Sequence, residues 1–270
     1  MYWHTERYCK IALIKNTKSY DSIIIGNSRA AWISPDNDRT LNLAFSGARY
    51  HEIYKFLEKY LENDKTVFIG LDFEDFYAGD RDGKTFVSKK LPEYIHHLFS
   101  FEISGASYAN HFHRDEFLPS IQISEKGNRV MIESDWKKLA DLNQMIEEQE
   151  FAQSEYTNTA VPNSINEKEA IDILKKIKNL LMSRDTKYVV FTHPILPATK
   201  EKLLRKHPQQ IKLIQQFSDE LKKIFPEAIE YALDHAFPNS LYRDPEHYSP
   251  EIGEKILQEL RARIDFQFSK

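Results

Sequence analysis

The sequence predicts an α/β protein built on a central parallel sheet of about five strands. Short, continuous runs of β-branched and aromatic residues closed by glycine are typical of strands buried on both faces, and the clearest lie at 21–26 and 66–71. Segments with apolar residues three and four positions apart alternate with these runs, as amphipathic crossover helices do. Since short loops join the elements, the alternation favours parallel pairing of the strands.

The composition is that of an ordinary globular chain. Its 270 residues are 41% hydrophobic and 29% charged, which argues against disorder and is enough for one domain with a sizeable core. A formal net charge of −4 gives no general attraction to nucleic acid, so no nucleic-acid partner is expected. The single cysteine, Cys9, excludes an internal disulfide framework and a cysteine-based zinc site. No apolar run approaches the roughly 20 residues of a membrane span.

The first 72 residues carry three predicted strands and a helix. The strands lie at 21–26, 40–45 and 66–71, and the helix at 50–61 repeats apolar residues along one face. Periodicity is then lost between residues 79 and 163. We expect an irregular or helical insertion there, within a single domain that spans residues 1–270.

Regular patterns return at Ser164, which forms a capping-box pattern with Glu167 ahead of an amphipathic helix. A fourth strand is predicted at 187–192. A helix that begins at Pro208 is stopped before Pro226. A weaker fifth strand at 227–233 and an amphipathic helix at 250–264 complete the domain.

Candidate catalytic residues stand where the predicted strands end, the edge at which open parallel sheets bind ligands. Ser28 follows the first strand at the expected start of a helix, where free N–H groups can bind a developing oxyanion. A serine nucleophile needs a base that a third group orients. Asp244 and His247 supply both groups within one tight turn. Taken singly, Ser28 could instead cap a helix and Asp244 begin a turn.

The ordered set of blocks resembles the SGNH (GDSL-like) hydrolase superfamily, whose fold is a flavodoxin-like three-layer α/β/α sandwich. Similar blocks are Gly26-Asn27-Ser28-Arg29, Asn42-Leu43-Ala44-Phe45-Ser46-Gly47 and Asp244-Pro245-Glu246-His247. The resemblance spans residues 20–75 and 185–265. It implies a triad of Ser28, Asp244 and His247, with the backbone N–H groups of Ser28 and Gly47 in the oxyanion hole and no cofactor.

One block departs from the superfamily pattern. The resemblance implies a third oxyanion donor, an asparagine, where this chain has Asp72. A carboxylate repels an oxyanion unless it is protonated or turned away, and losing one donor can cost roughly 10²–10³ in rate. Asp72 therefore puts classical esterase speed in doubt.

That departure makes the chain similar to the bacterial branch related to the alginate acetylation proteins and the D-alanine transfer protein of teichoic acid synthesis. The resemblance implies a serine-dependent acyl ester hydrolase or acyltransferase, with O-acetyl the expected group, that acts on an exported or cell-surface polysaccharide. Its partners would be an acylated carbohydrate or small ester and a membrane-bound polysaccharide-modification machinery. It also implies an extracytoplasmic or membrane-anchored location, with the anchor absent from this chain; a cytoplasmic location is the alternative.

Two further residues are candidates for substrate binding. Arg29, beside the nucleophile, could bind a carboxylate or phosphate, or could simply be solvated or ion-paired. His193 stands at the end of the fourth predicted strand and could contact substrate or belong to the core or a loop.

Three other functions would each account for part of the sequence. An α/β-hydrolase needs several strands before its nucleophile, and Ser28 leaves room for at most one. A metal enzyme would have to use the histidine pairs at 96–97 and at 111 and 113, which lack acidic partners at a suitable spacing. A catalytically silent SGNH-fold module that binds a glycan is favoured by Asp72 and by the aromatic residues of the insertion. The three triad residues favour the enzyme, since a silent module has no physical need for all of them.

Overall fold

The central sheet is parallel and has four strands in the part of the chain that the structure describes. This computed structural model describes residues 2–37, 39–78, 121–131, 164–242 and 247–268. The strands are β1 (Ser22–Ile25), β2 (Thr40–Asn42), β3 (Thr66–Leu71) and β6 (Lys187–Thr192), in the order β2-β1-β3-β6. All neighbouring strands pair in parallel, so the predicted α/β class is confirmed. β3 and β6 have the predicted bounds. β1 and β2 are shorter than the strands predicted at 21–26 and 40–45.

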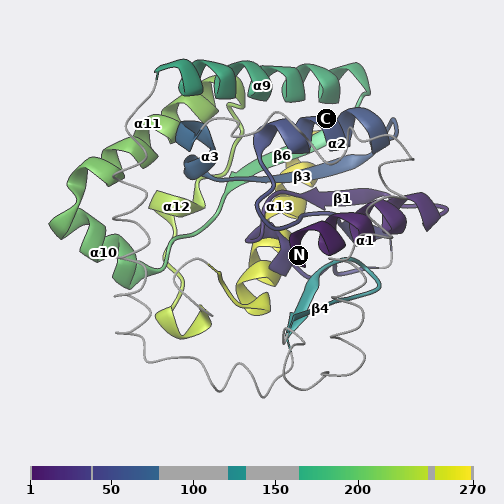
Figure 1. The fold of residues 1–270 in the computed structure, drawn as a ribbon, viewed down its shortest axis with the longest axis horizontal. Coiled ribbons are helices and arrows are strands. Elements are labelled where there is room, and N and C mark those ends of the chain that lie inside the picture. Colours follow the sequence, from purple (N-terminus) through teal and green to yellow (C-terminus); the bar gives the residue numbers. More distant parts are fainter. Residues whose placement is uncertain (1, 38, 79–120, 132–163, 243–246, 269–270) are drawn as a thin grey trace.

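Helices cover both faces of the sheet (Figure 1). One face packs against α2 (Tyr50–Tyr60), α3 (Phe73–Ala78), α9 (Ser164–Ser183) and α11 (Pro208–Ile224). The other face packs against α13 (Pro250–Phe268). Alternation along the strands explains the two cores, because Ile23 and Val67 belong to the first and Ile24 and Phe68 to the second.

The predicted fifth strand at 227–233 does not form as a strand. Only Ile229 pairs with β6, through a parallel bridge to Phe191. The carboxylate of Glu230 then accepts hydrogen bonds from the N–H groups of Ala232 and Leu233 and caps the short helix α12 (Tyr231–Asp234). The prediction was wrong because this side chain competes for the backbone N–H groups that a strand would have to pair.

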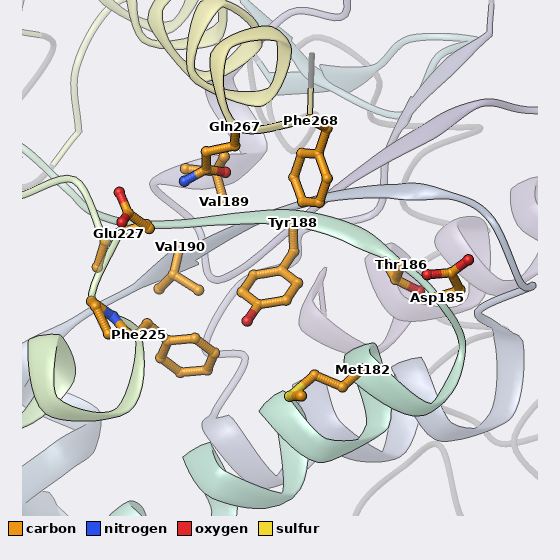
Figure 2. A pocket seen from close by; sticks show the side chains of 12 residues that line it. Met182, Asp185, Thr186, Tyr188, Val189, Val190, Phe225, Glu227, Gln267 and Phe268 are labelled. Atoms are coloured by element: carbon orange, nitrogen blue, oxygen red, sulfur yellow. The ribbon is translucent and has the colours of Figure 1, made fainter. Parts of the chain in front are cut away.

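A cavity of about 440 Å³ lies beside the amino-terminal half of β6, along the edge that the fifth strand was predicted to cover. Its walls come from both faces of β6, with Val189 and Phe268 on one side of the strand and Tyr188 and Met182 on the other (Figure 2). The helices α9, α11 and α13 all end near it, because they run back against the parallel strands. The cavity therefore marks the amino end of the sheet, opposite the predicted active site.

A hairpin covers the β2 edge of the sheet. β4 (Ile121–Ile123) and β5 (Arg129–Met131) pair antiparallel, and the Asn42 N–H at the end of β2 donates to the Lys126 carbonyl at 2.8 Å. The amino-terminal helix α1 (Tyr2–Asn16) lies beside this hairpin and β1 (Figure 1). The remainder of the predicted insertion at 79–163 lies outside the described residues.

Shorter elements complete the described chain. They are the 3₁₀ helices η1 (Ala30–Trp32) and η3 (Asn239–Leu241) and the helix α10 (Pro197–Lys206). Among the helices that the structure describes, none combines the length and the apolar character needed to cross a membrane.

Candidate active site

The carboxyl ends of β1, β3 and β6 meet at one edge of the sheet. The register pairs Ile25 with Ile69 and Leu71 with Thr192, so the residues that follow each strand emerge together. Ser28, Asp72 and His193 are those residues. The structure thus places three of the predicted site residues where open parallel sheets bind ligands.

Ser28 and His247 lie in hydrogen-bond contact although 219 positions separate them in the sequence. The distance from Nε2 of His247 to Oγ of Ser28 is 3.0 Å, and both residues are half-buried. This spacing suits proton transfer from a serine nucleophile to a histidine base. Residues 243–246, which include the predicted triad member Asp244, lie outside the described residues.

The base of the His247 loop is pinned to the core. Tyr242 and Tyr248 form an antiparallel bridge, and the Ser249 N–H donates to the Leu241 carbonyl at 2.8 Å. Tyr248 is fully buried in the core that α13 covers. The histidine is therefore carried by a loop whose end is fixed in the core.

The turn that carries Ser28 follows β1 closely. A Cβ atom at Gly26 would lie 2.7 Å from the Gly70 carbonyl oxygen of β3, so only glycine allows the two strand ends to approach this far. The Asn27 side chain then accepts the Arg29 N–H at 2.9 Å, a local bond that stabilises the turn. Ser28 lies just before the three-residue 3₁₀ helix η1, close to the helix start that the sequence predicted.

Gly47, the predicted second oxyanion donor, lies in the turn after β2. Its φ of +61° is in the left-handed region that favours glycine. Two residues earlier, the Phe45 N–H donates to the Gly26 carbonyl at 3.1 Å. This bond joins the Gly47 turn to the start of the Ser28 turn.

Asp72 is buried, with 4% of its surface exposed, and both its oxygens accept hydrogen bonds from the chain. Arg29 donates to Oδ1 at 2.5 Å, and the Asn27 side-chain amide donates to Oδ2. Burial raises the pKa of Asp72, and the charge of Arg29, its hydrogen bond and the charge of His247 only partly offset that rise. The carboxyl is thus engaged by Arg29 and Asn27, while its role as an oxyanion donor stays a prediction.

Arg29 is a buried, ion-paired side chain. Besides Asp72, its guanidinium contacts Glu74 on α3 at 3.1 Å. Of the two possibilities that the sequence left open, ion pairing is the one that these contacts describe. Substrate binding by Arg29 stays a prediction.

His193 is only 2% exposed and packs its ring over Gly70. Its Nδ1 lies 3.1 Å from the Tyr248 hydroxyl, and its Nε2 is buried without a hydrogen-bond partner among the described residues. Burial, and then the charges of Arg29 and His247, hold the pKa of His193 well below its usual range. The ring is therefore neutral at physiological pH and lies behind Gly70; its contact with substrate stays a prediction.

The structure adds polar residues that sequence reasoning did not assign to the site. Asn27 links the Ser28 turn to Asp72, and Glu74 accepts a hydrogen bond from Arg29, as Asp72 does. Asn27 stood inside the first recognised block, which was a signal that could have singled it out; nothing in the pattern pointed to Glu74. The histidines at 96, 97, 111 and 113, weighed as metal ligands, lie outside the described residues.

No protein-family model matches this sequence, and no curated protein is found to be similar to it.

Proposed function

We propose that the protein is a serine-dependent acyl ester hydrolase or O-acyltransferase of the SGNH type. The observation that carries the proposal is the 3.0 Å contact between Oγ of Ser28 and Nε2 of His247 at the carboxyl edge of a parallel sheet. Such a contact between a serine and a base from a distant segment is what nucleophilic acyl transfer requires. The strand order β2-β1-β3-β6 is compatible with the flavodoxin-like sandwich of that superfamily.

The reaction proceeds in two steps. His247 takes the proton of the Ser28 hydroxyl while Oγ attacks the ester carbonyl, and the backbone N–H groups of Ser28 and Gly47 bind the oxyanion. The ester C–O bond breaks, the alcohol leaves with the proton from His247, and an acyl-serine remains. Water or a sugar hydroxyl then gives its proton to His247 and attacks the acyl-serine. The bond between the acyl carbon and Oγ of Ser28 breaks, Oγ takes the proton from His247, and the acid or the new ester is released. Asp244 is the expected partner that orients the imidazole.

The resemblance extends the proposal to the substrate. It favours O-acetyl groups on an exported or cell-surface polysaccharide, handled together with a membrane-bound machinery. Arg29 and His193 are the proposed contacts to substrate.

A catalytically silent glycan-binding module is the second candidate. The observation that favours it is Asp72, whose two oxygens are engaged by Arg29 and Asn27 at the position of the expected donor. In such a module the Ser28–His247 contact would have no chemical role.

The test is hydrolysis of p-nitrophenyl acetate by the wild type, Ser28→Ala and His247→Ala. We expect each variant to lose at least about 10³-fold in kcat, since serine and base act as a unit. Matched controls are Ser183→Ala, whose hydroxyl bonds the Leu180 carbonyl on α9, and His235→Ala beside α12; both should keep wild-type kcat. Variants with unchanged activity would exclude Ser28 as nucleophile. A wild type that neither turns over ester nor is labelled at Ser28 by a serine-reactive phosphonate, yet binds acetylated glycan, would establish the silent module instead.

A further inference from the structure

A buried ion pair lies directly behind the Gly47 turn. Glu6 of α1 accepts two hydrogen bonds from Arg129 of β5, each at 3.0 Å, and the two side chains are 0% and 5% exposed. The same carboxylate accepts the backbone N–H of Ser46 at 2.8 Å, and Arg129 also donates to the Ser46 hydroxyl. Residues from two other segments of the chain therefore converge on Ser46, the residue that precedes Gly47.

Stability alone is a weak explanation for this cluster. The desolvation of two buried charges commonly offsets their attraction, so apolar residues of similar volume would often serve the fold as well. What apolar residues cannot supply is an acceptor for the Ser46 N–H. The carboxylate thus has a specific effect on the backbone of the turn.

One face of α1 follows the whole segment between β2 and Gly47. Lys10 donates to the Asn42 carbonyl at 3.0 Å, the Arg7 guanidinium lies 4.6 Å from the centre of the Phe45 ring, and Glu6 binds Ser46. The order of the contacts is reversed between the two segments, so the helix runs antiparallel to the segment that it holds.

The segment between β2 and Gly47 is in turn hydrogen-bonded to the residues that follow Ser28. The Asn42 side-chain amide donates to the carbonyls of Ala30 and Ile33, both at 2.8 Å, and its oxygen accepts the Ala44 N–H. These bonds fix the Gly47 turn relative to the Ser28 turn, which is the relation that an oxyanion hole built from both backbones needs.

We infer that Glu6 and Arg129 are positioning residues that set the orientation of the Gly47 N–H toward the oxyanion. The inference rests on the proposed function, because it assigns these two residues to the oxyanion hole of that reaction. Neither side chain touches the reacting atoms; both act through Ser46. The amino-terminal helix and the β4–β5 hairpin are thereby parts of the active site's support.

The charge of Glu6 is consistent with this role. Burial raises its pKa, but the hydrogen bond and charge of Arg129, the charge of Lys10 and the Ser46 N–H outweigh burial and lower it overall. Glu6 is therefore an anion at neutral pH, which makes it a strong acceptor for the Ser46 N–H.

Glu6→Gln tests the inference with two readouts. We expect kcat for p-nitrophenyl acetate to fall about 10- to 100-fold with KM changed less than about threefold, since an interaction made in the transition state is lost. We also expect the backbone amide of Ser46 to exchange faster with deuterium, because the neutral Gln oxygen is a weaker acceptor than the carboxylate. The control Glu58→Gln removes the charge from the Lys55–Glu58 ion pair of α2, which contacts neither turn, and should leave kcat within twofold.

A second variant separates positioning from folding. Glu6→Met/Arg129→Met removes both buried charges, so it should fold even where Glu6→Gln does not. Because methionine offers the Ser46 N–H no acceptor, kcat should stay low. Wild-type kcat in this double variant, or unchanged exchange at Ser46 in Glu6→Gln, would overturn the inference. An inactive wild type would overturn the proposed function and the catalytic consequence with it, whereas the exchange result would still decide whether Glu6 holds the turn.

Discussion

At the carboxyl ends of the strands the protein buries charged groups that contact one another, whereas at the amino end of β6 it leaves a cavity lined mainly by apolar side chains. At the carboxyl ends, the buried ion pairs are Arg29–Asp72 and Glu6–Arg129. At the amino end of β6, the cavity is lined by Tyr188, Phe225 and their neighbours (Figure 2). The function that we propose assigns the chemistry to the end with mutual contacts between buried polar groups, and not to the end with this cavity.

The largest effect should follow from breaking the charge cluster behind Ser28. Asp72→Ala leaves Arg29 buried with only Glu74 as an ion-pair partner among the contacts described above, and we expect a loss of about 3–5 kcal/mol in the free energy of unfolding. Urea denaturation measures it. Asp72→Asn, which keeps a hydrogen-bond acceptor for Arg29, is the milder control. A loss below about 1 kcal/mol for Asp72→Ala would mean that the cluster adds little to the fold.

A substitution at the apolar end should lower the free energy of unfolding and leave kcat unchanged. Phe225→Ala removes a buried ring that packs edge-on against Tyr188, with ring centres 5.9 Å apart. We expect a loss of about 3 kcal/mol, near the lower end for such changes because the ring already borders a cavity. The kcat of the folded variant for p-nitrophenyl acetate should equal that of the wild type. A fall in kcat beyond twofold would show that the two ends are coupled.

The strands could be predicted because each is a short run buried on both faces, a property that local sequence carries. The helix α1 was not predicted, because charged residues such as Glu6 and Lys10 occupy its buried face and obscure the apolar period. The fifth strand was overpredicted for the related reason that the cap formed by Glu230 cannot be inferred from propensity.

Part of the candidate site could be predicted from the sequence, and part of it could not. Strand-end reasoning brings Ser28 and Asp72 to one edge, since it depends only on topology. The pairing of Arg29 with Glu74, and the hold of Glu6 on Ser46, depend on side-chain directions across segments 45 and 40 residues apart. Those directions are set by packing, and no spacing in the sequence encodes them.

The smallest expected effect, a pH dependence of stability, distinguishes the charged end from the apolar one. Lys10 is fully buried between the carbonyls of Asn42 and Gly127, and burial lowers its pKa to about 7 against the attraction of Glu6. The unfolded chain, with an ordinary lysine, therefore binds more protons than the folded chain between pH 7 and about pH 10. Stability should rise with pH across this window as the cost of the buried charge is removed.

Lys10→Met removes that dependence. Comparing urea denaturation of the wild type and the variant at pH 7, 8 and 9 cancels the groups that both chains share. The wild-type free energy of unfolding should rise relative to that of the variant by at most about 1.4 kcal/mol per pH unit. Parallel pH profiles would show that Lys10 stays charged throughout, held by Glu6 and the two carbonyls more strongly than burial opposes it. A rise in the wild type alone would place a titrating charge at the carboxyl end, next to the segment that leads to Gly47.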